Sequence, residues 1–214
     1  MLAPVIDEKT PLLLGSASPR RKALIESLGI PLTVVAVDAD EQRRAAEAPD
    51  TYLDRVTRDK LARVTAHPRA VGTSVVLVAD TIVLLGQDIL GKPTDGEEAT
   101  AMLTSLSGRA HEVKTRFLLG EAPRATQGST ANPTAPLHAE TVTTKVQFRP
   151  LEAEEIRRYA ATGEGMDKAG AYAVQGIGSF AVQRIEGSYA NVVGLPVCEV
   201  VVALRRLGFL PAFP

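Results

Sequence analysis

Short hydrophobic runs alternate with amphipathic segments along most of the chain. The runs predict strands at residues 12–14, 32–37, 74–85, 111–120, 141–148 and 180–185. The amphipathic segments predict helices at 18–29, 48–67, 94–108, 151–163 and 196–208. Strands that alternate with helices of this length are typical of an α/β sheet. We therefore expect one α/β domain over residues 1–214.

Two parts of this pattern need closer definition. The apolar run at 74–85 is either one long strand or a bent pair of strands. The strands at 111–120 and 141–148 are expected to be antiparallel neighbours. The segment between them, 121–140, is rich in Pro, Ala, Thr and Gly, which predicts a loop.

Residues 15–24, GSASPRRKAL, place two arginines at the start of the first predicted helix. Ser18 is expected to cap this helix and Pro19 to occupy its first turn. Arg20 and Arg21 then lie where the helix dipole disfavours cations. Either both arginines turn into solvent or a bound anion completes the site, and the free N–H groups of a helix start favour a phosphate. The apolar positions expected to face the core are Ala23, Leu24 and Leu28.

Two further charges stand where apolar residues are expected. Asp80 interrupts the run VVLVADTIVLL. A buried carboxylate needs a partner or a metal, but Asp80 and Thr81 could instead mark a turn at the end of a strand. Lys60 shares a helical stripe with three apolar residues, Leu53, Val56 and Val64. Its ammonium therefore either extends along its stem to the surface or reaches into a cleft.

Residues 86–93, GQDILGKP, nearly match the phosphate-binding motif G-x-x-x-x-G-K-[ST]. Pro93 replaces the hydroxyl residue and removes a backbone N–H, so we reject a P-loop but keep Lys92 as a candidate phosphate contact. Glu41 follows a strand in the charged segment DADEQR, where solvent exposure is the default expectation. Cations and carboxylates near strand ends, without histidine, together predict metal-assisted phosphate chemistry with Mg²⁺ or Mn²⁺.

The composition narrows the possible partners. A formal net charge of −1 argues against a nucleic-acid partner. Cys198 is the single cysteine and lies in an apolar run, so we expect a core thiol rather than a nucleophile. The N-terminus lacks the features of a signal peptide, and no apolar run approaches the ~20 residues that cross a bilayer. We therefore expect a cytoplasmic protein without a membrane partner.

Several separated motifs occur in the order SxSPRR, DEQR, DKLA, ADTIV and GKP, and residues 167–196 form a long C-terminal signature. In these motifs the chain resembles the Maf family of nucleotide pyrophosphatases over roughly residues 12–207. The resemblance implies a mixed, elongated central sheet flanked by helices, with a cleft, and often a homodimer. It also implies hydrolysis of nucleoside triphosphates to the monophosphate and pyrophosphate with a divalent cation.

The same resemblance assigns roles to particular residues. Asp80 matches the proton acceptor and Glu41 matches another residue of the cleft; our own mechanistic hypothesis makes Asp80 and Glu41 the metal ligands. The expected substrate and phosphate contacts are Ser16, Arg20, Arg21, Lys60 and Lys92. Arg20, Thr81 and Gln175 match the members that act on dTTP and UTP rather than on 7-methyl-GTP. The amide of Gln175 suits a pyrimidine, because it can donate to a ring carbonyl and accept from the imide N–H.

The departures from the family pattern lie outside this predicted chemistry. Gly15 stands where alanine is more usual, Asp40 where a second glutamate is common, and the loop at 121–140 is longer than typical. The activity could serve to clear non-standard pyrimidine nucleotides. Two other functions stay open: a non-catalytic nucleotide-binding regulator of cell division, and a metal-dependent phosphatase that releases orthophosphate.

Overall fold

The computed structural model of the protein describes residues 4–123 and 135–213. Seven strands form a mixed sheet in the order β2-β1-β3-β5-β6-β7, with β4 paired to β3. The chain divides into two compact units. The first comprises Met1–Asp80, Arg116–Thr141 and Leu195–Pro214, and the second Thr81–Thr115 and Val142–Gly194. The predicted mixed α/β sheet with flanking helices is confirmed.

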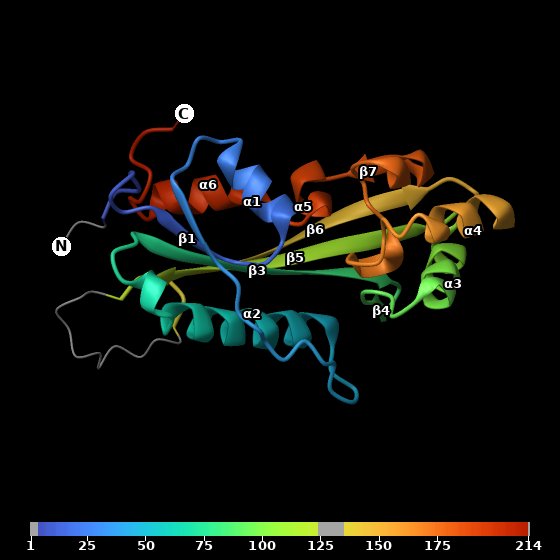
Figure 1. The fold of residues 1–214 in the computed structure, drawn as a ribbon, viewed down its shortest axis with the longest axis horizontal. Helices are drawn as coiled ribbons and strands as arrows, with labels where there is room; N and C mark the ends of the chain where they lie inside the picture. The colour runs from blue at the N-terminus through green and yellow to red at the C-terminus, as the bar shows by residue number, and fades with distance from the viewer. Residues whose placement is uncertain (1–3, 124–134, 214) are drawn as a thin grey trace. The chain divides into compact units, whose positions relative to one another are not determined.

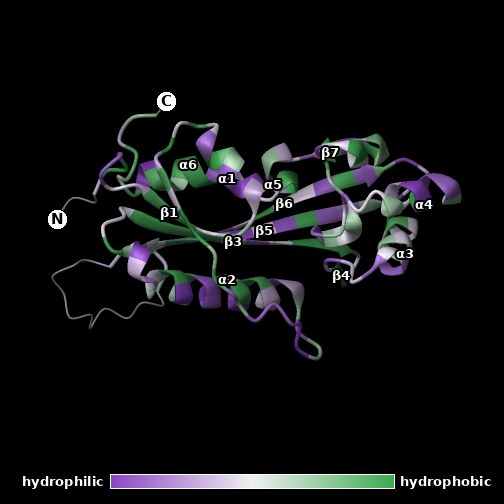
Figure 2. Ribbon diagram, in the orientation of Figure 1, coloured by the Kyte–Doolittle hydropathy of each residue, from purple (hydrophilic) through white to green (hydrophobic). Residues whose placement is uncertain are grey.

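The first unit is built on parallel strands. β1 (Leu12–Gly15) pairs in parallel with β2 (Leu32–Val35) and with β3 (Val75–Leu85). The helices that cover these strands are α1 (Pro19–Glu26), α2 (Pro49–Thr65) and α6 (Val197–Arg206). Figure 1 shows α2 on one face of the strands and α1 and α6 on the other. Because both faces are covered, β1 is apolar along its length, whereas α2 alternates between polar and apolar positions (Figure 2).

The first helix is shorter than predicted and presents a different face to the core. Ser18 caps it as expected, since the Ser18 Oγ accepts from the Arg21 N–H at 3.5 Å. The inward face was predicted wrongly. Ala23 is exposed and Leu24 half-buried, whereas Arg21 and Ile25 are buried. The helix turns this face inward because the Arg21 guanidinium finds hydrogen-bond partners in the core.

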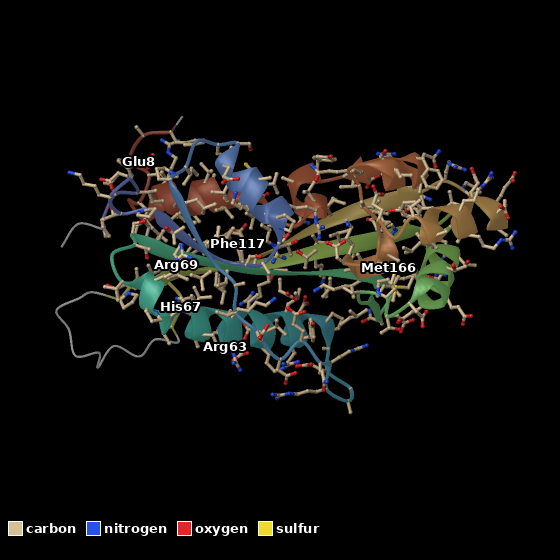
Figure 3. All side chains as sticks on the ribbon, in the orientation of Figure 1. Glu8, Arg63, His67, Arg69, Phe117 and Met166 are labelled. Carbon is tan, nitrogen blue, oxygen red and sulfur yellow. The ribbon has the colours of Figure 1, made fainter. Side chains whose placement is uncertain are left out.

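The apolar run at 74–85 forms a single strand of 11 residues, β3, rather than a bent pair. Asp80 is buried in the middle of this strand, so the alternative of a turn at Asp80 and Thr81 is wrong. After α2, the short 3-10 helix η1 (Pro68–Ala70) is capped by His67, whose Nδ1 accepts from the Arg69 N–H at 3.1 Å (Figure 3).

The second unit combines antiparallel strands with short helices. Its elements are β4 (Asp88–Leu90), α3 (Gly96–Leu106), α4 (Ala153–Ala161), η2 (Ala169–Ala171), η3 (Ile177–Ala181), β7 (Val182–Glu186) and α5 (Tyr189–Val193). β4 folds back on β3 through a turn at Gly86, which has a φ of +66°. The near-P-loop segment is therefore a hairpin, in agreement with our rejection of a P-loop.

The long strands β5 (Ala110–Glu121) and β6 (His138–Phe148) are neighbours in the sheet. The Phe148 N–H donates to the Arg109 carbonyl and the Leu137 N–H to the Leu119 carbonyl, so the two strands run antiparallel as predicted. Of the predicted loop at 121–140, residues 124–134 lie outside the described residues.

Each unit has its own hydrophobic core. Leu13, Leu61 and Val64 belong to the core of the first unit, and Phe148 and Tyr172 to that of the second. Met166 packs against the second core (Figure 3). Burial explains why these elements form where apolar periodicity predicted them.

Two sequence predictions concern the outside of the molecule. Cys198 is exposed on α6, so the expected core thiol was wrong. The apolar run around Cys198 forms an amphipathic helix, and Cys198 falls on its solvent side while Val200 and Leu204 are buried. Within the part of the chain that the structure describes, no helix has the length and apolar character needed to cross a membrane.

Candidate active site

The ammonium of Lys60 lies between two carboxylates. Its Nζ is 2.6 Å from the Asp80 Oδ1 and 2.7 Å from the Glu41 Oε1. Asp80 comes from β3, Lys60 from α2, and Glu41 from the loop between β2 and α2. The predicted helical stripe is confirmed, because the apolar residues that share it with Lys60 are fully buried: Leu53, Val56 and Val64. The Lys60 side chain is only 10% exposed, so its ammonium does not extend to the surface.

The two ion pairs of Lys60 differ in how far the carboxylate partner is buried. The Asp80 side chain is 11% exposed, and the neighbouring ammonium compensates for the loss of water around its charge. The Glu41 side chain is 42% exposed, which agrees with the expected exposure of the DADEQR segment. Solvent screens this second pair, so it contributes little to stability. Glu41 thus combines an exposed carboxylate with a contact to the buried pair.

The two adjacent arginines have different surroundings. Arg21 is buried, and its Nη1 donates to the Ala79 carbonyl at 2.8 Å and to the Ser16 Oγ at 3.3 Å. Arg20 is partly exposed. The sequence left open whether the Arg21 guanidinium turns into solvent. It does not, because the protein itself supplies its hydrogen-bond acceptors, and one of them is the backbone carbonyl next to Asp80.

The pKa of the Arg21 guanidinium depends on its burial and on the charges around it. Burial lowers the pKa of the Arg21 guanidinium, and the positive charge of Arg20 lowers it further. The negative charges of Asp80 and Glu41 act in the opposite direction and raise the pKa of Arg21. Because arginine starts from so high a value, it stays protonated here. The candidate site therefore contains two carboxylates, Asp80 and Glu41, and three basic side chains, Arg20, Arg21 and Lys60.

Sequence reasoning missed two residues of α2 that hold the Glu41 loop. The Tyr52 hydroxyl donates to the Glu41 carbonyl, and the Arg55 guanidinium donates to carbonyls on either side of it. Burial together with the charges of Asp80 and Glu41 raises the pKa of Tyr52, so this hydroxyl remains a donor. The chain carries no local signal for these contacts, since the donors and the loop are 11 to 15 residues apart.

The remaining candidates belong to the second unit. The Thr81 hydroxyl lies 2.8 Å from the Thr115 hydroxyl and donates to the Gly194 carbonyl at 3.3 Å. Lys92 and Gln175 are exposed. The structure thus brings Asp80, Glu41 and Lys60 into contact, and Ser16 into contact with Arg21. The convergence of Thr81, Lys92 and Gln175 with these residues stays a prediction.

The loop that carries Gln175 is anchored by one carboxylate. Glu164 accepts from the Ile177 N–H at 2.9 Å and from the Gly178 N–H at 2.8 Å. Gly176, which follows Gln175, has a φ of +85°, and a Cβ there would lie 2.3 Å from the Glu164 Oε1. A side chain at position 176 is therefore strained by its backbone conformation and would also press against the Glu164 carboxylate. Gly176 and the contacts of Glu164 thus shape the loop beside Gln175.

The chemistry of the donors fits a hard divalent cation shared with a ligand. Mg²⁺ is usually bound by one or two carboxylates together with substrate phosphates and waters. Asp80 and Glu41 supply two carboxylates held by one ammonium. Among the described residues, no group of three or more His, Cys, Asp or Glu side chains could form a metal cage from protein ligands alone. Two carboxylates therefore fit a cation that a phosphorylated ligand helps to coordinate.

Residues 11–207 match the protein family described as Maf-like protein. The chain belongs to the Maf family. A dTTP/UTP pyrophosphatase from Myxococcus xanthus is 48% identical over 204 residues, which cover 94% of each chain. A dTTP/UTP pyrophosphatase from Geobacter sulfurreducens is 47% identical over 203 residues, 95% of this chain and 100% of that protein. The Maf resemblance seen in the sequence motifs is confirmed.

A solved structure shows a more distant similarity. It is a nucleoside-triphosphatase (dITP/XTP pyrophosphatase) from Mycobacterium abscessus, with a TM-score of 0.42 and 13% sequence identity. The match covers 91% of this chain and 93% of that chain.

Proposed function

We propose that this Maf protein hydrolyses dTTP and UTP to the nucleoside monophosphate and pyrophosphate. The proposal is supported by full-length relatives named dTTP/UTP pyrophosphatase. The single observation that carries it is the contact of the Lys60 ammonium with both Asp80 and Glu41, next to the buried Arg21. This arrangement keeps two carboxylates close together despite their like charges.

In the proposed mechanism Asp80 and Glu41 would hold a divalent cation, Mg²⁺ or Mn²⁺. Such a cation stabilises negative charge on the phosphate oxygens as it develops. Asp80 orients a water and accepts its proton as the water oxygen attacks the α-phosphorus. The new bond joins that oxygen to the α-phosphorus, the bond from the α-phosphorus to the bridging oxygen breaks, and pyrophosphate leaves.

The cationic residues divide the remaining tasks. Lys60 keeps both carboxylates in place and offsets their charge. Arg21 and Ser16 fix the backbone beside Asp80, because the Arg21 Nη1 donates to the Ala79 carbonyl. Arg20 and Lys92 contact the triphosphate, and the expected phosphate contacts of Ser16, Arg21 and Lys60 stay predictions. Positioning and electrostatic stabilisation supply most of the acceleration in this type of reaction.

Base selectivity rests on Gln175 and Thr81, together with Arg20. The Gln175 amide donates to a ring carbonyl of thymine or uracil and accepts from the imide N–H. A glutamate at this position offers only acceptors when it is ionised. Gln175→Glu should therefore reduce hydrolysis of dTTP and UTP relative to 7-methyl-GTP, while unchanged selectivity would contradict the assignment.

The test of the activity is product analysis. The purified protein is incubated with Mg²⁺ and dTTP, UTP, CTP, GTP or 7-methyl-GTP, and the products are separated by ion-exchange chromatography. We expect monophosphate and pyrophosphate from dTTP and UTP, and loss of turnover when a chelator removes the cation. Orthophosphate as the first product would favour a metal-dependent phosphatase. Nucleotide binding without any product would favour a non-catalytic regulator.

The role of Asp80 is tested by Asp80→Asn. This variant should lose turnover while keeping its fold and measurable nucleotide binding, because the amide cannot accept the proton. The matched control is Asp88→Asn, which changes an exposed carboxylate on the neighbouring strand β4 and should retain activity. Near-normal turnover of Asp80→Asn would remove Asp80 from the mechanism. The homodimer implied by the resemblance stays a prediction, which sedimentation velocity can test.

A further inference from the structure

The loop that carries Glu41 is attached to α2 through three consecutive backbone carbonyls. The Arg55 Nη1 donates to the Asp40 carbonyl and its Nη2 to the Gln42 carbonyl, each at 2.9 Å. Between them, the Tyr52 hydroxyl donates to the Glu41 carbonyl at 3.1 Å. Tyr52 and Arg55 lie one turn apart on α2. The backbone on both sides of Glu41 is therefore held by a single helix.

Arg55 is itself fixed by a buried carboxylate. Its Nε lies 2.7 Å from the Glu47 Oε1 and its Nη2 lies 2.9 Å from the Glu47 Oε2, a two-point ion pair. Glu47 is buried and also accepts from the Arg44 N–H. The hydrogen bonds from Arg55 lower the pKa of Glu47 to about 2, so this pair stays ionised at neutral pH. The guanidinium thus uses all three nitrogens at once, which a lysine ammonium cannot do.

The side chain of Glu41 has a weaker attachment than its backbone. Its carboxylate is 42% exposed and contacts the Lys60 Nζ. Solvent screens an ion pair with an exposed partner, so this contact is too weak to hold a loop by itself. Because Arg55 and Lys60 belong to the same helix, the backbone contacts determine where the Glu41 carboxylate meets the Lys60–Asp80 pair.

We propose that Arg55 is a positioning residue for the reaction. It holds the Glu41 loop so that the Glu41 carboxylate can share a divalent cation with Asp80, and it does not touch the substrate. This inference rests on the proposed function. Since an error of about 1 Å in the placement of a reacting group can cost roughly 10²-fold in rate, loss of the Arg55 contacts should affect catalysis strongly.

The experiment compares Arg55→Ala, Glu41→Gln and the double variant in dTTP hydrolysis at a series of Mg²⁺ concentrations and, without turnover, in the binding of Mn²⁺ measured by electron paramagnetic resonance, where Arg55→Ala should weaken Mn²⁺ binding. Arg55→Ala should lower kcat by roughly 10- to 100-fold and raise the Mg²⁺ concentration that gives half-maximal rate. If Arg55 acts through Glu41, the double variant is no slower than Glu41→Gln alone. Added guanidinium ion should partly restore the rate of Arg55→Ala but not that of Glu41→Gln.

The matched control is Arg58→Ala. Arg58 lies on the same helix, is 45% exposed and pairs with Asp54 at 2.8 Å, so its removal should leave the rate and the Mg²⁺ dependence near those of the wild type. If Arg55→Ala does not fold, Arg55→Lys serves instead. Because lysine can make fewer of these contacts, that variant should require more Mg²⁺ while its circular dichroism stays unchanged.

Two results would overturn the positioning role alone. One is a wild-type Mg²⁺ dependence in Arg55→Ala or Arg55→Lys, and the other is a rate loss that multiplies fully with that of Glu41→Gln. In both cases the wild type still converts dTTP to pyrophosphate and Asp80→Asn is inactive, so the proposed function stands. Failure of the wild type to release pyrophosphate from dTTP or UTP would instead remove the proposed function, and the role of Arg55 with it.

Discussion

Replacing Lys60 by methionine tests the physical basis of the candidate active site. The change removes the ammonium that lies 2.6 Å from the Asp80 Oδ1 and 2.7 Å from the Glu41 Oε1. Methionine keeps an unbranched side chain of similar length, so the apolar contacts of the lysine stem on α2 are largely retained. The variant therefore isolates the loss of the charge beside the buried Asp80 carboxylate.

The expected cost follows from the burial of each partner. Two unit charges 2.6 Å apart attract by about 6 kcal/mol at an effective dielectric constant of about 20, before the loss of hydration is counted. Removal of one partner from a buried pair costs about 3 to 5 kcal/mol in unfolding free energy. The exposed Glu41 pair adds at most about 1 kcal/mol. We expect a loss of about 3 to 5 kcal/mol from a total stability of about 5 to 15 kcal/mol.

Urea unfolding followed by circular dichroism measures this loss in the wild type, Lys60→Met, Asp80→Asn and the double variant. A neutral amide in place of the Asp80 carboxylate no longer requires the ammonium. The double variant should therefore be more stable than the sum of the single effects predicts, by about 2 kcal/mol.

The matched control for this cycle is Lys22→Met. Lys22 pairs with Glu26 on α1, and both side chains are 49% exposed, so this change should cost less than about 0.5 kcal/mol. Additivity of Lys60→Met and Asp80→Asn within about 0.5 kcal/mol would refute the reasoning, because the two charges would then not depend on each other.

Three further predictions concern other parts of the fold. Gly15→Ala should destabilise the protein by about 1 to 3 kcal/mol in urea unfolding, because the added Cβ would lie 2.4 Å from a Val64 methyl and 2.8 Å from a Val78 methyl. Val64→Ala should relieve part of this loss, and an equal loss in both backgrounds would contradict the Val64 contact as its cause. Burial lowers the pKa of His111 to about 4, below its value of about 6.5 in the unfolded chain, so its contribution to stability is full above pH 6.5 and about 3 kcal/mol is lost as the pH falls to 4. A His111→Leu variant should lack that part of the pH dependence, and an unchanged pH profile of unfolding would argue against it. Gly176→Ala should displace the loop from Glu164 and change the ratio of dTTP to GTP hydrolysis, whereas an unchanged ratio would separate this loop from base selection.

The regular elements were predictable because their signals are local. The helices at 48–67 and 94–108 were found within a few residues of their ends, and Asp95 caps the second through the Glu98 N–H at 2.8 Å. The stripe that places Lys60 toward the core was also found, since side chains three and four residues apart share a helix face. The strand β4 and the helix α5 were missed, because three to five residues are too few for a periodic pattern.

The errors have physical causes that involve more distant parts of the chain. Hydrophobicity suggested the wrong face for α1, where Arg21 is buried because the Ala79 carbonyl, 58 residues away, accepts from it. Cys198 was expected in the core because its neighbours are apolar, but its position around α6 leaves it exposed. A turn at Asp80 and Thr81 was an alternative because of local turn chemistry, but Asp80 lies within β3, where the Lys60 ammonium offsets the cost of burying its carboxylate.

The sequence by itself determined the α/β class, the ends of the main helices, the Maf family and the set of charged residues to consider. These properties depend on neighbouring residues or on motifs read along the chain. Only the tertiary structure decided which charges meet: Lys60 with Asp80 and Glu41, Arg21 with the backbone of β3, and Arg55 with the Glu41 loop. The physical reason is that a buried charge is stable only beside its partner, and packing brings that partner from a distant segment of the chain.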